Sequence, residues 1–340
     1  MKTVLVTGGA GFIGSNFVRY LLDNYPDYKV VVLDALTYAG TLDNFSDKIK
    51  SCPRFEFWHG NIRHSQLVGE LVDNADIVVH MAAESHVARS IYDDTLFFET
   101  DVLGTQTLAN AVLTHPVERF IHISTSEVYG SALSVPMAED HPLNPMSPYA
   151  SAKTGADRLV YSYVATYNIP AIIIRPFNNF GPNQHLEKVI PRFITSAIMN
   201  EPLTVHGNGG SSRDWVYVDD HCKALDRVMH CPIEKVKGEV LNVATGVDYK
   251  IRDIAEIIIE KMGKDRSLIT HTENRLGQVS RHIGSTSKVA DLLGWKAEID
   301  FLSGLDRAIS WYKENEVWWK RLLWMRAIPM RKVKGKLEIY

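Results

Sequence analysis

The amino-acid sequence predicts an α/β fold, a doubly wound parallel sheet with a smaller C-terminal α/β lobe. Short apolar runs alternate with helical stretches through the first half of the chain. Their almost unbroken apolar character is typical of strands that are buried on both faces of a parallel sheet. After Arg175 this rhythm changes, and turn-forming segments separate shorter helices. The alternation and its change together predict the two parts.

Six apolar runs are the expected strands of the main sheet. They are Thr3–Thr7, Lys29–Asp34, Phe55–His59, Ile77–Met81, Phe120–Ser124 and Ala171–Arg175. Helical segments between them, the first around Phe17–Asn24, complete βαβ units that place helices on both faces of the sheet. In the second part we expect a strand at Asp214–Val218 and helices at Val189–Met199, Ile251–Met262, Ser287–Leu293 and Leu302–Tyr312.

The composition excludes several classes of protein. With 340 residues, 45% hydrophobic and 23% charged, the chain is an ordinary globular protein with room for two lobes. A net charge of −3 argues against general binding to nucleic acid or to an anionic membrane, and no apolar run is long enough to span a bilayer. The 3 cysteines and 13 histidines form no metal motif, so no metal is expected. Reduced thiols indicate a cytoplasmic location.

A glycine pattern follows the first expected strand. Gly8, Gly11 and Gly14 are spaced three residues apart between a strand and a helix. Residues without a Cβ let the backbone approach a pyrophosphate, and the N–H groups of the following helix then point at the anion. Asp34 ends the second strand, 20 residues after Gly14, where a carboxylate binds a ribose 2′-OH and repels a 2′-phosphate. The pattern predicts a Rossmann domain that binds NAD.

The expected domain organisation follows from these segments. Residues 1–176 form the NAD-binding domain, to which residues 211–245 return. Residues 177–210 and 246–320 form a second lobe, and residues 321–340 form a basic, solvated C-terminal extension. Ligands of such folds bind at the carboxyl ends of the strands. We therefore expect the active site in a cleft between the two lobes.

Tyr149 and Lys153 fit the pattern Tyr-x-x-x-Lys, in a helix that is predicted over Ser147–Tyr161. Residues four apart share a helix face, so the ammonium is expected near the phenol and the cofactor ribose. A nearby positive charge favours the phenolate, which can take a hydroxyl proton while the nicotinamide takes a hydride. Ser124 and Thr125 end the preceding strand, at the edge where the cofactor lies. The pair predicts oxidation of an alcohol.

These motifs resemble the extended short-chain dehydrogenases. Further segments resemble the dTDP-glucose 4,6-dehydratases, and the resemblance extends to about Trp319. The segments are Leu36–Gly40, Ala82–Val87, Arg89–Ile91, Asn178–Asn179, Glu187–Pro191, Arg213–Trp215, Tyr217–Val218 and Leu293–Trp295. The resemblance implies a lyase that oxidises a nucleotide-linked sugar at C4, removes the C5 proton, eliminates water across C5–C6 and returns the hydride to C6. It also implies a homodimer.

The catalytic run departs from that family. There a Thr-Asp-Glu run supplies a Glu that removes the C5 proton and an Asp that protonates the leaving hydroxyl. This chain has Thr125, Ser126 and Glu127. Thr125 and Glu127 carry over directly, whereas a serine hydroxyl is too weak an acid to replace a carboxylic acid. Thr-Ser-Glu resembles the GDP-mannose 4,6-dehydratases, in which case one carboxyl can act first as base and then as acid.

The resemblance also implies binding residues. Additional cofactor contacts are expected from Phe12, Ile13, Asn61, Ile62, Ala82 and Ala83. Substrate contacts are expected from Ser85, His86, Asn178, Asn179, Lys188, Arg213, Asn242 and Arg275. Lys188 and Arg213 suit a diphosphate, because a cation and a guanidinium match phosphate oxygens. Asn61, Ala88, Asp101 and Gln278 depart from the family pattern and, with Ser126, indicate a specialised branch.

The leading prediction is an NAD-dependent nucleotide-sugar 4,6-dehydratase that acts on a dTDP- or UDP-linked hexose, with UDP-N-acetylglucosamine as one candidate. Ser126 leaves a 4- or 5-epimerase and a UDP-glucuronate decarboxylase open as alternatives on the same scaffold. A non-catalytic NAD-binding sensor is the third alternative. Such a sensor would be expected to have lost Tyr149 or Lys153, and this chain has kept both.

Overall fold

The fold was analysed in a computed structural model, which describes the whole chain except residues 275–276, 327–328, 332–336 and 340. A seven-stranded sheet with the order β10-β6-β5-β4-β1-β2-β3 forms its centre, and every neighbouring pair is parallel. Its strands are β1 (Lys2–Thr7), β2 (Tyr28–Asp34), β3 (Phe55–His59), β4 (Ile77–His80), β5 (Arg119–Ile123), β6 (Ala171–Pro176) and β10 (Val240–Val243). The Rossmann-type α/β fold and the six predicted strands are confirmed.

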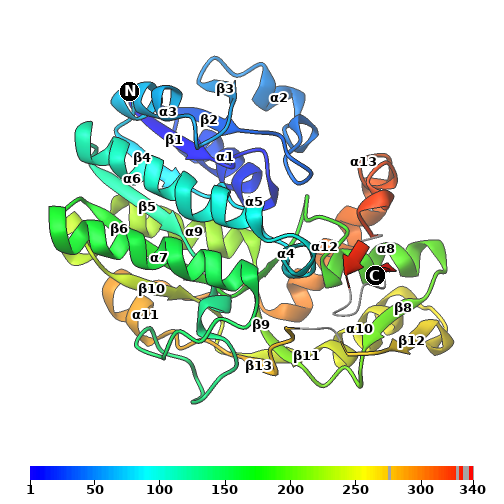
Figure 1. Cartoon of the computed structure of the whole chain (residues 1–340). Coiled ribbons are helices and arrows are strands. Elements are labelled where there is room, and N and C mark those ends of the chain that lie inside the picture. Colours follow the sequence, from blue (N-terminus) through cyan, green and yellow to red (C-terminus); the bar gives the residue numbers. More distant parts are fainter. Residues whose placement is uncertain (275–276, 327–328, 332–336, 340) are drawn as a thin grey trace.

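Helices cover both faces of this sheet (Figure 1). The principal ones are α1 (Phe12–Asn24), α3 (Ser65–Asp73), α6 (Thr105–Thr114), α7 (Pro148–Tyr167) and α9 (Val218–His230). Successive residues of β1 point to opposite faces, as the two-residue period of a strand requires. Val4 and Val6 pack in one core with residues of α1 and α9, while Leu5 packs in the other with residues of α3 and α6. The sheet is therefore buried on both sides.

Short elements connect the layers. They are α2 (Asp47–Lys50), α4 (Val87–Tyr92), α5 (Thr95–Phe97), the π-helical turn η2 (Phe98–Gly104) and the 3₁₀ turns η1 (Leu42–Asn44), η3 (Ser126–Tyr129), η4 (Ile233–Lys235), η5 (Arg266–Leu268) and η6 (Leu323–Arg326). The chain order reverses between β1 and β4, which lie side by side although β2 and β3 separate them in sequence. Such a switch point opens a crevice at the carboxyl ends of the strands.

The second lobe is built on a smaller sheet. Strand β9 (Ser212–Tyr217) pairs with β7 (Asn178–Phe180), β11 (Asp248–Lys250) and β13 (Arg281–His282), while β8 (Leu203–His206) pairs with β12 (Ile269–Thr272). Its helices are α8 (Val189–Met199), α10 (Ile251–Met262), α11 (Ser287–Leu293), α12 (Phe301–Glu314) and α13 (Glu316–Lys320). Aromatic side chains such as Phe180, Trp215 and Phe301 fill its core. All four helices expected in this part are present.

Residues 211–245 cross between the two parts. Strand β9 at the start of this segment lies in the smaller sheet, whereas α9 packs against α1 and β10 extends the main sheet beside β6. The bounds of the two domains stay a prediction.

No helix among the described residues is both long and apolar enough to cross a membrane.

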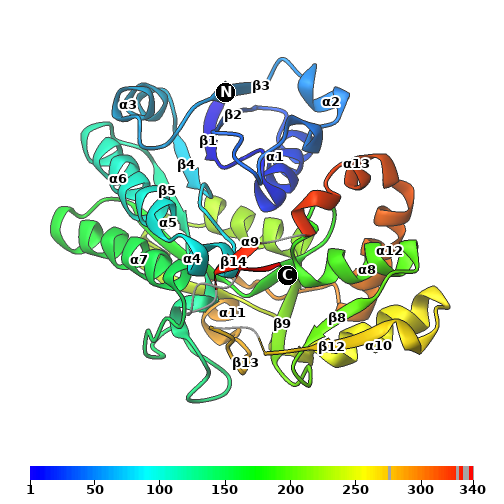
Figure 2. The same ribbon diagram turned by 45° about the vertical axis from the view of Figure 1, so that its right-hand side comes forward.

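The C-terminal segment corrects the prediction of a solvated extension. Within residues 321–326, Met325 is buried, and Arg326 donates to Glu201 at 2.8 Å. Beyond them β14 (Pro329–Arg331) pairs antiparallel with β15 (Leu337–Ile339), and β14 lies beside α4 (Figure 2). The apolar side chain of Met325 explains why the start of the segment packs, since burial of apolar surface favours contact over solvation.

Candidate active site

A cavity of about 460 Å³ lies at the carboxyl ends of the main strands, between the large sheet and the second lobe. Its lining includes residues that directly follow five neighbouring strands. They are Gly8 after β1, Ala35 after β2, Gly60 after β3, Met81 after β4 and Ser124 after β5. Lys188 and Arg213 line it from the other side. The predicted cleft is therefore present.

The glycine turn forms one end of the cavity. Gly8 has a φ of +70°, and a Cβ on Gly14 would lie 2.3 Å from the Gly8 carbonyl oxygen, so the turn closes tightly against α1 only without side chains. Helix α1 begins at Phe12 with no side-chain cap. Its first N–H groups and the positive end of its dipole face the cavity, as a pyrophosphate requires.

Asp34 ends β2 at the same end of the cavity. Its carboxylate accepts hydrogen bonds from the backbone N–H groups of Ala10 at 2.9 Å and Leu36 at 2.8 Å. Burial raises the pKa of Asp34, and these two hydrogen bonds oppose the rise. A carboxylate has lone pairs for about four hydrogen bonds, so it can still accept from ribose hydroxyls. The predicted cofactor residues Phe12, Ile13, Asn61, Ile62, Ala82 and Ala83 line the cavity with it.

Tyr149 and Lys153 both line the cavity from α7. Ser147 caps this helix by accepting from Ala150 N at 3.1 Å, and Pro148 occupies its first position, which places Tyr149 in the first turn. Lys153 Nζ donates to the Ile123 carbonyl oxygen at 2.7 Å. Burial lowers the pKa of Lys153, and Asp101 and Asp157 oppose this.

The pKa of Tyr149 differs from the expectation. Burial raises it well above its usual value, Asp101 and Glu127 add to the rise, and a hydrogen bond with Thr125 opposes it. Lys153 donates its hydrogen bond to the Ile123 carbonyl oxygen. The role of Lys153 in favouring the phenolate of Tyr149 stays a prediction.

Asp101 lies behind this pair on η2. Its Oδ1 accepts from the Glu84 backbone N–H at 2.8 Å, and its Oδ2 has no hydrogen-bond partner among the described residues. Burial raises the pKa of Asp101 to about 7, with Lys153 opposing the rise. The residue that departs from the family pattern thus places a buried carboxyl beside the Tyr149–Lys153 pair.

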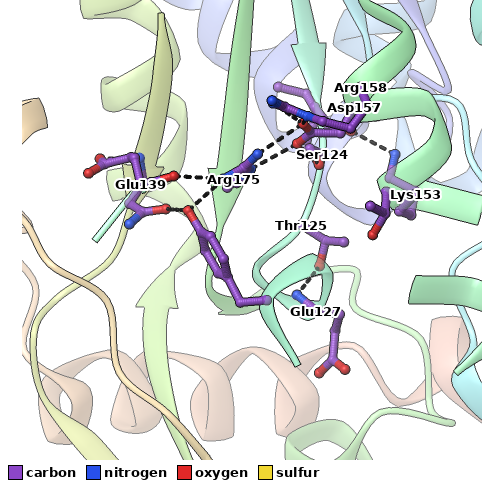
Figure 3. A network of polar contacts seen from close by, with 12 residues as sticks. Ser124, Thr125, Glu127, Glu139, Lys153, Asp157, Arg158 and Arg175 are labelled. Atoms are coloured by element: carbon purple, nitrogen blue, oxygen red, sulfur yellow. Dashed lines mark hydrogen bonds and ion pairs between the residues drawn. The ribbon is translucent and has the colours of Figure 1, made fainter. Parts of the chain in front are cut away.

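The run Thr125, Ser126 and Glu127 follows β5, and all three residues line the cavity. Thr125 Oγ1 accepts from the Glu127 backbone N–H at 3.2 Å, which caps η3 (Figure 3). The Glu127 side chain is 18% exposed and points away from the polar network around Arg175. Ser126 is buried, with its Oγ 3.4 Å from His282 Nδ1.

A buried ion-pair network supports α7 from behind (Figure 3). Asp157 accepts from Arg175 Nε on β6 at 2.8 Å and from Ser124 Oγ at 2.7 Å, and Arg158 contacts the same carboxylate. These contacts join the ends of β5 and β6 to α7, the helix that carries Lys153. They therefore hold α7 at a fixed distance from the carboxyl ends of these two strands.

The predicted substrate residues divide into three groups. Ser85, His86, Asn178, Asn179, Lys188 and Arg213 all line the cavity. Asn242 does not, which corrects its assignment. It is fully buried on β10, where its amide accepts from Tyr129 Oη at 2.7 Å and donates to the Met137 carbonyl oxygen at 3.0 Å. Both ends of the amide are used within the core. Arg275 lies outside the described residues.

The structure adds residues that the sequence left without a role. Tyr38 Oη donates to Glu187 at 3.0 Å, Arg89 donates to the other Glu187 oxygen at 3.2 Å, and the Arg89 guanidinium lies 4.2 Å from the centre of the Tyr38 ring. Burial raises the pKa of the adjacent Glu84 to about 7. Tyr38, Glu84, Arg89 and Glu187 all lie in segments that resemble the family, so the resemblance could have identified them as site residues. His282 lies in no such segment.

Comparisons with known proteins agree with this geometry. The family described as GDP-mannose 4,6 dehydratase matches residues 5–308. The chain is 48% identical over 309 residues to the low-salt glycan biosynthesis protein Agl12 of Haloferax volcanii, covering 91% of this chain and 98% of that protein. It is 39% identical over 337 residues to a dTDP-glucose 4,6-dehydratase of Streptomyces antibioticus, covering 98% of each.

Solved structures give the same result. DesIV, a dTDP-glucose 4,6-dehydratase from Streptomyces venezuelae crystallised with NAD, has a TM-score of 0.90 and 41% identity, covering 94% of this chain and 99% of that one. A UDP-glucose 4-epimerase from Thermotoga maritima has a TM-score of 0.85 but 27% identity, covering 92% and 99%. The chain therefore belongs to the GDP-mannose 4,6-dehydratase family of extended short-chain dehydrogenases.

Proposed function

We propose that this protein is an NAD-dependent nucleotide-sugar 4,6-dehydratase that acts on a dTDP- or UDP-linked hexose. The observation that carries the proposal is the convergence of three kinds of group on one cavity. A glycine turn with an uncapped helix start, a tyrosine with its lysine, and the carboxylate of Glu127 all line it. The identity to dTDP-glucose 4,6-dehydratases over almost the whole chain supports dehydration over epimerisation.

The residues present fit NAD. The first turn of α1 suits the pyrophosphate, and the free lone pairs of Asp34 suit the adenosine ribose while excluding a 2′-phosphate. When bound, NAD supplies an acceptor for the sugar C4 hydride, a donor that returns it to C6, and a positive charge beside the phenol. Asn61, Ile62, Ala82 and Ala83 supply the remaining wall of this half of the cavity.

Proton transfer is the task of the protein side chains. Tyr149 takes the proton of the C4 hydroxyl, and its hydrogen bond with Thr125 stabilises the phenolate that this needs. Lys153 favours the same phenolate once its ammonium is released from the Ile123 carbonyl. The resulting 4-ketone acidifies the C5 proton, which Glu127 removes as general base.

The second lobe holds the nucleotide end of the substrate. Lys188 and Arg213 place two cations on its side of the cavity, which suits the diphosphate. Asn178 and Asn179 lie on β7, which pairs with β9 of the second lobe, and offer amides to the sugar. Ser85 and His86 line the same cavity. We expect the sugar ring near Tyr149 and Glu127, since both side chains must reach it.

A homodimer is part of the proposal. Apolar side chains on α5, η2, α6 and α7 are exposed, among them Leu96 at 43%, Phe98 at 42% and Leu103 at 51%. Exposed apolar surface on neighbouring elements is typical of an interface. Leu103→Asp is expected to convert the dimer to a monomer in light-scattering measurements, while Leu302→Asp on α12, where the leucine is 43% exposed, should not. An unchanged mass for the Leu103 variant would contradict this interface.

We also propose that the enzyme works in the cytoplasm. Its three cysteines, Cys52, Cys222 and Cys231, are free thiols, which suits a reducing compartment. Fractionation of the producing cells is expected to recover the activity with the contents of the cytoplasm. Recovery with an extracellular or membrane fraction would contradict this.

One experiment tests the function directly. The protein is incubated with dTDP-glucose, UDP-glucose, UDP-N-acetylglucosamine, GDP-mannose and UDP-glucuronate, and the products are identified by mass. The proposal predicts a product lighter than its substrate by one water, with no net accumulation of reduced nicotinamide. A product of unchanged mass would indicate an epimerase, and loss of CO₂ would indicate a decarboxylase.

A further inference from the structure

The proposed mechanism gives no role to His282, a buried histidine next to the site. His282 lies on β13, its side chain is fully buried, and it is not among the residues that line the cavity. It nevertheless lies directly behind the catalytic run, because both Ser126 and Glu127 approach its ring. Its position raises the question of what a second titratable group does there.

The hydrogen bonds of the imidazole define its proton arrangement. Nε2 lies 2.6 Å from the Gly130 carbonyl oxygen. Since a carbonyl oxygen only accepts, Nε2 carries the proton, and Nδ1 of the neutral ring presents a lone pair. Burial lowers the pKa of His282, Glu127 opposes this, and Arg213 and His141 lower the pKa further. The resting ring is therefore a neutral acceptor at Nδ1.

Two groups of the catalytic run face this lone pair. Ser126 Oγ lies 3.4 Å from Nδ1, and Glu127 Oε1 lies 3.9 Å from the same atom. The serine hydroxyl can donate to Nδ1. The carboxyl of Glu127 can do so once it has taken a proton and moved about 1 Å closer to the ring. His282 thus connects the proposed base to the hydroxyl that stands where a carboxylic acid is needed.

The smaller sheet fixes the position of the ring. His282 pairs in register with Arg213 on β9, and the neighbouring Arg281 donates to Asp248 on β11 at 2.8 Å. The edge of the Phe177 ring packs against the imidazole, with 6.2 Å between the ring centres. The ring is therefore held by contacts that do not depend on Ser126 or Glu127.

We propose that His282 and Ser126 together replace the carboxylic acid that the catalytic run lacks, with His282 relaying the proton that Glu127 removes. The proposal rests on the dehydratase function proposed above. Ser126 lines the cavity and donates to the leaving hydroxyl, whereas His282 acts through Ser126 and is a positioning residue with a relay function.

The elimination balances without any other reactant. Glu127 takes the C5 proton, the C5–H electron pair becomes the C5=C6 double bond, and the C6–O bond breaks with its pair on oxygen. The proton on Glu127 moves to His282 Nδ1. The imidazolium then donates this proton to Ser126 Oγ as the Ser126 hydroxyl proton moves to the leaving oxygen, and water leaves. All three side chains return to their starting protonation states.

Two variants of His282 test the relay. His282→Phe removes the proton site, and His282→Asn keeps a hydrogen-bonding group that cannot carry the proton. In single turnovers we expect elimination of water to fall on the order of 100-fold in both, as for loss of a general acid. Oxidation at C4, followed by the absorbance of reduced nicotinamide, should stay within about threefold, so that reduced cofactor accumulates.

A matched control separates the relay from packing. His221 on α9 is equally buried, and its ring nitrogens have no hydrogen-bond partner among the described residues. His221→Phe is expected to leave both half-reactions unchanged. Rescue provides a second readout: Ser126→Asp in the His282→Phe background should restore elimination at least about tenfold, because an aspartic acid donates its own proton.

Each remaining outcome overturns the relay. Wild-type elimination in both His282 variants would show that Glu127 alone moves the proton, and full elimination in His282→Asn alone would reduce the role to hydrogen bonding. Equal loss of both half-reactions, or no rescue by Ser126→Asp, would also refute it. If His282→Phe does not fold by circular dichroism, His282→Asn and its Ser126→Asp double variant decide. A wild-type protein that dehydrates no nucleotide sugar contradicts the proposed function instead.

Discussion

At the scale of single residues, Asp101 opposes the loss of the proton that Tyr149 needs for catalysis. Tyr149 must lose a proton to act as base, whereas burial and Asp101 raise its pKa. Lys153 donates its hydrogen bond to the Ile123 carbonyl oxygen. A positive charge close to the phenol is therefore needed to favour the phenolate of Tyr149.

Glu127→Gln tests the assignment of the general base. The amide cannot accept the C5 proton, while C4 oxidation depends on Tyr149, so reduced nicotinamide should accumulate and turnover should fall by about 100-fold or more. Incorporation of solvent deuterium at C5, measured by mass, should stop. Deuterium that still enters C5 in the variant would assign the base to another residue. Glu99→Gln, on the surface, is the control.

The pair of His230 and Asp226 predicts a pH dependence of stability. The hydrogen bond with Asp226 raises the pKa of His230, and Nδ1 lies 2.9 Å from Oδ1 of that carboxylate. Because the pKa of His230 is higher in the folded protein than the value of about 6.5 in the unfolded chain, protonation of His230 stabilises the fold. This stabilisation is fully present below about pH 6.5 and is lost as the pH rises through the pKa of the folded protein. Because the pKa of Asp226 is lowered, its carboxylate stays ionised in the folded protein to a lower pH than in the unfolded chain.

Urea unfolding at pH 5.5 and 8.5 measures this contribution. His230→Gln should lower the free energy of unfolding at pH 5.5 by less than about 1 kcal/mol, since the pair is partly exposed. The difference between the variant and the wild type should shrink at pH 8.5. A larger difference at pH 8.5 would reverse the sign and contradict the assignment.

Single residues also show where inference from the sequence ends. Ser126 stands out as a departure because Thr125 and Glu127 on either side of it match the Thr-Asp-Glu run of the family. Asn242 was wrongly assigned to the substrate, because the sequence cannot distinguish an amide in a cavity from an amide in the core. His282 is separated by more than 150 residues from the run that it contacts, and no local spacing records that contact. Only the paired strands β9 and β13 bring it there.

At the scale of elements, the packing of α7 against the sheet depends on the ion pair between Asp157 and Arg175. Arg175 is 1% exposed, so Asp157→Asn leaves its buried guanidinium without a full counter-charge. The free energy of unfolding should fall by about 3–5 kcal/mol in denaturant titrations. Arg158→Ala removes a half-exposed partner of the same carboxylate and should cost less than about 1 kcal/mol. Equal losses in both variants would contradict the role of the buried pair.

The turn between β1 and α1 gives a second prediction at this scale. Gly14→Ala places a Cβ 2.3 Å from the Gly8 carbonyl oxygen, so the turn must open. We expect a loss of about 1–3 kcal/mol in stability and at least a tenfold weaker affinity for NAD by calorimetry. Gly69→Ala on α3 has its nearest neighbour at 3.9 Å and should be neutral or stabilising. Normal NAD affinity in the Gly14 variant would refute the account.

Elements with a long periodic pattern were predicted well, and short or interrupted ones were not. The six apolar runs became strands because burial on both faces leaves an unbroken apolar signal. Strand β13 has only two residues, and η2 interrupts a helix with a π-helical turn, so neither leaves a period to recognise. The hairpin of β14 and β15 was not predicted, because the basic residues of this segment indicated a solvated extension.

At the scale of the whole molecule, the fold brings together groups that lie far apart in sequence. The glycine turn, the run after β5 and the cations of the second lobe line one cavity because the carboxyl ends of the parallel strands meet at a single edge. The sequence predicted this cleft from the strand order that βαβ units impose. It could not predict how the second lobe closes over it, since that depends on contacts among short strands.

Transfer of a label within one sugar tests the central claim most directly. The substrate found in the nucleotide-sugar panel is prepared with deuterium at C4 and converted by the wild-type protein, and the label is located by NMR. A 4,6-dehydratase is predicted to give a product that has lost one water and carries the deuterium at C6. Deuterium that remains at C4 of a product of unchanged mass would contradict the account.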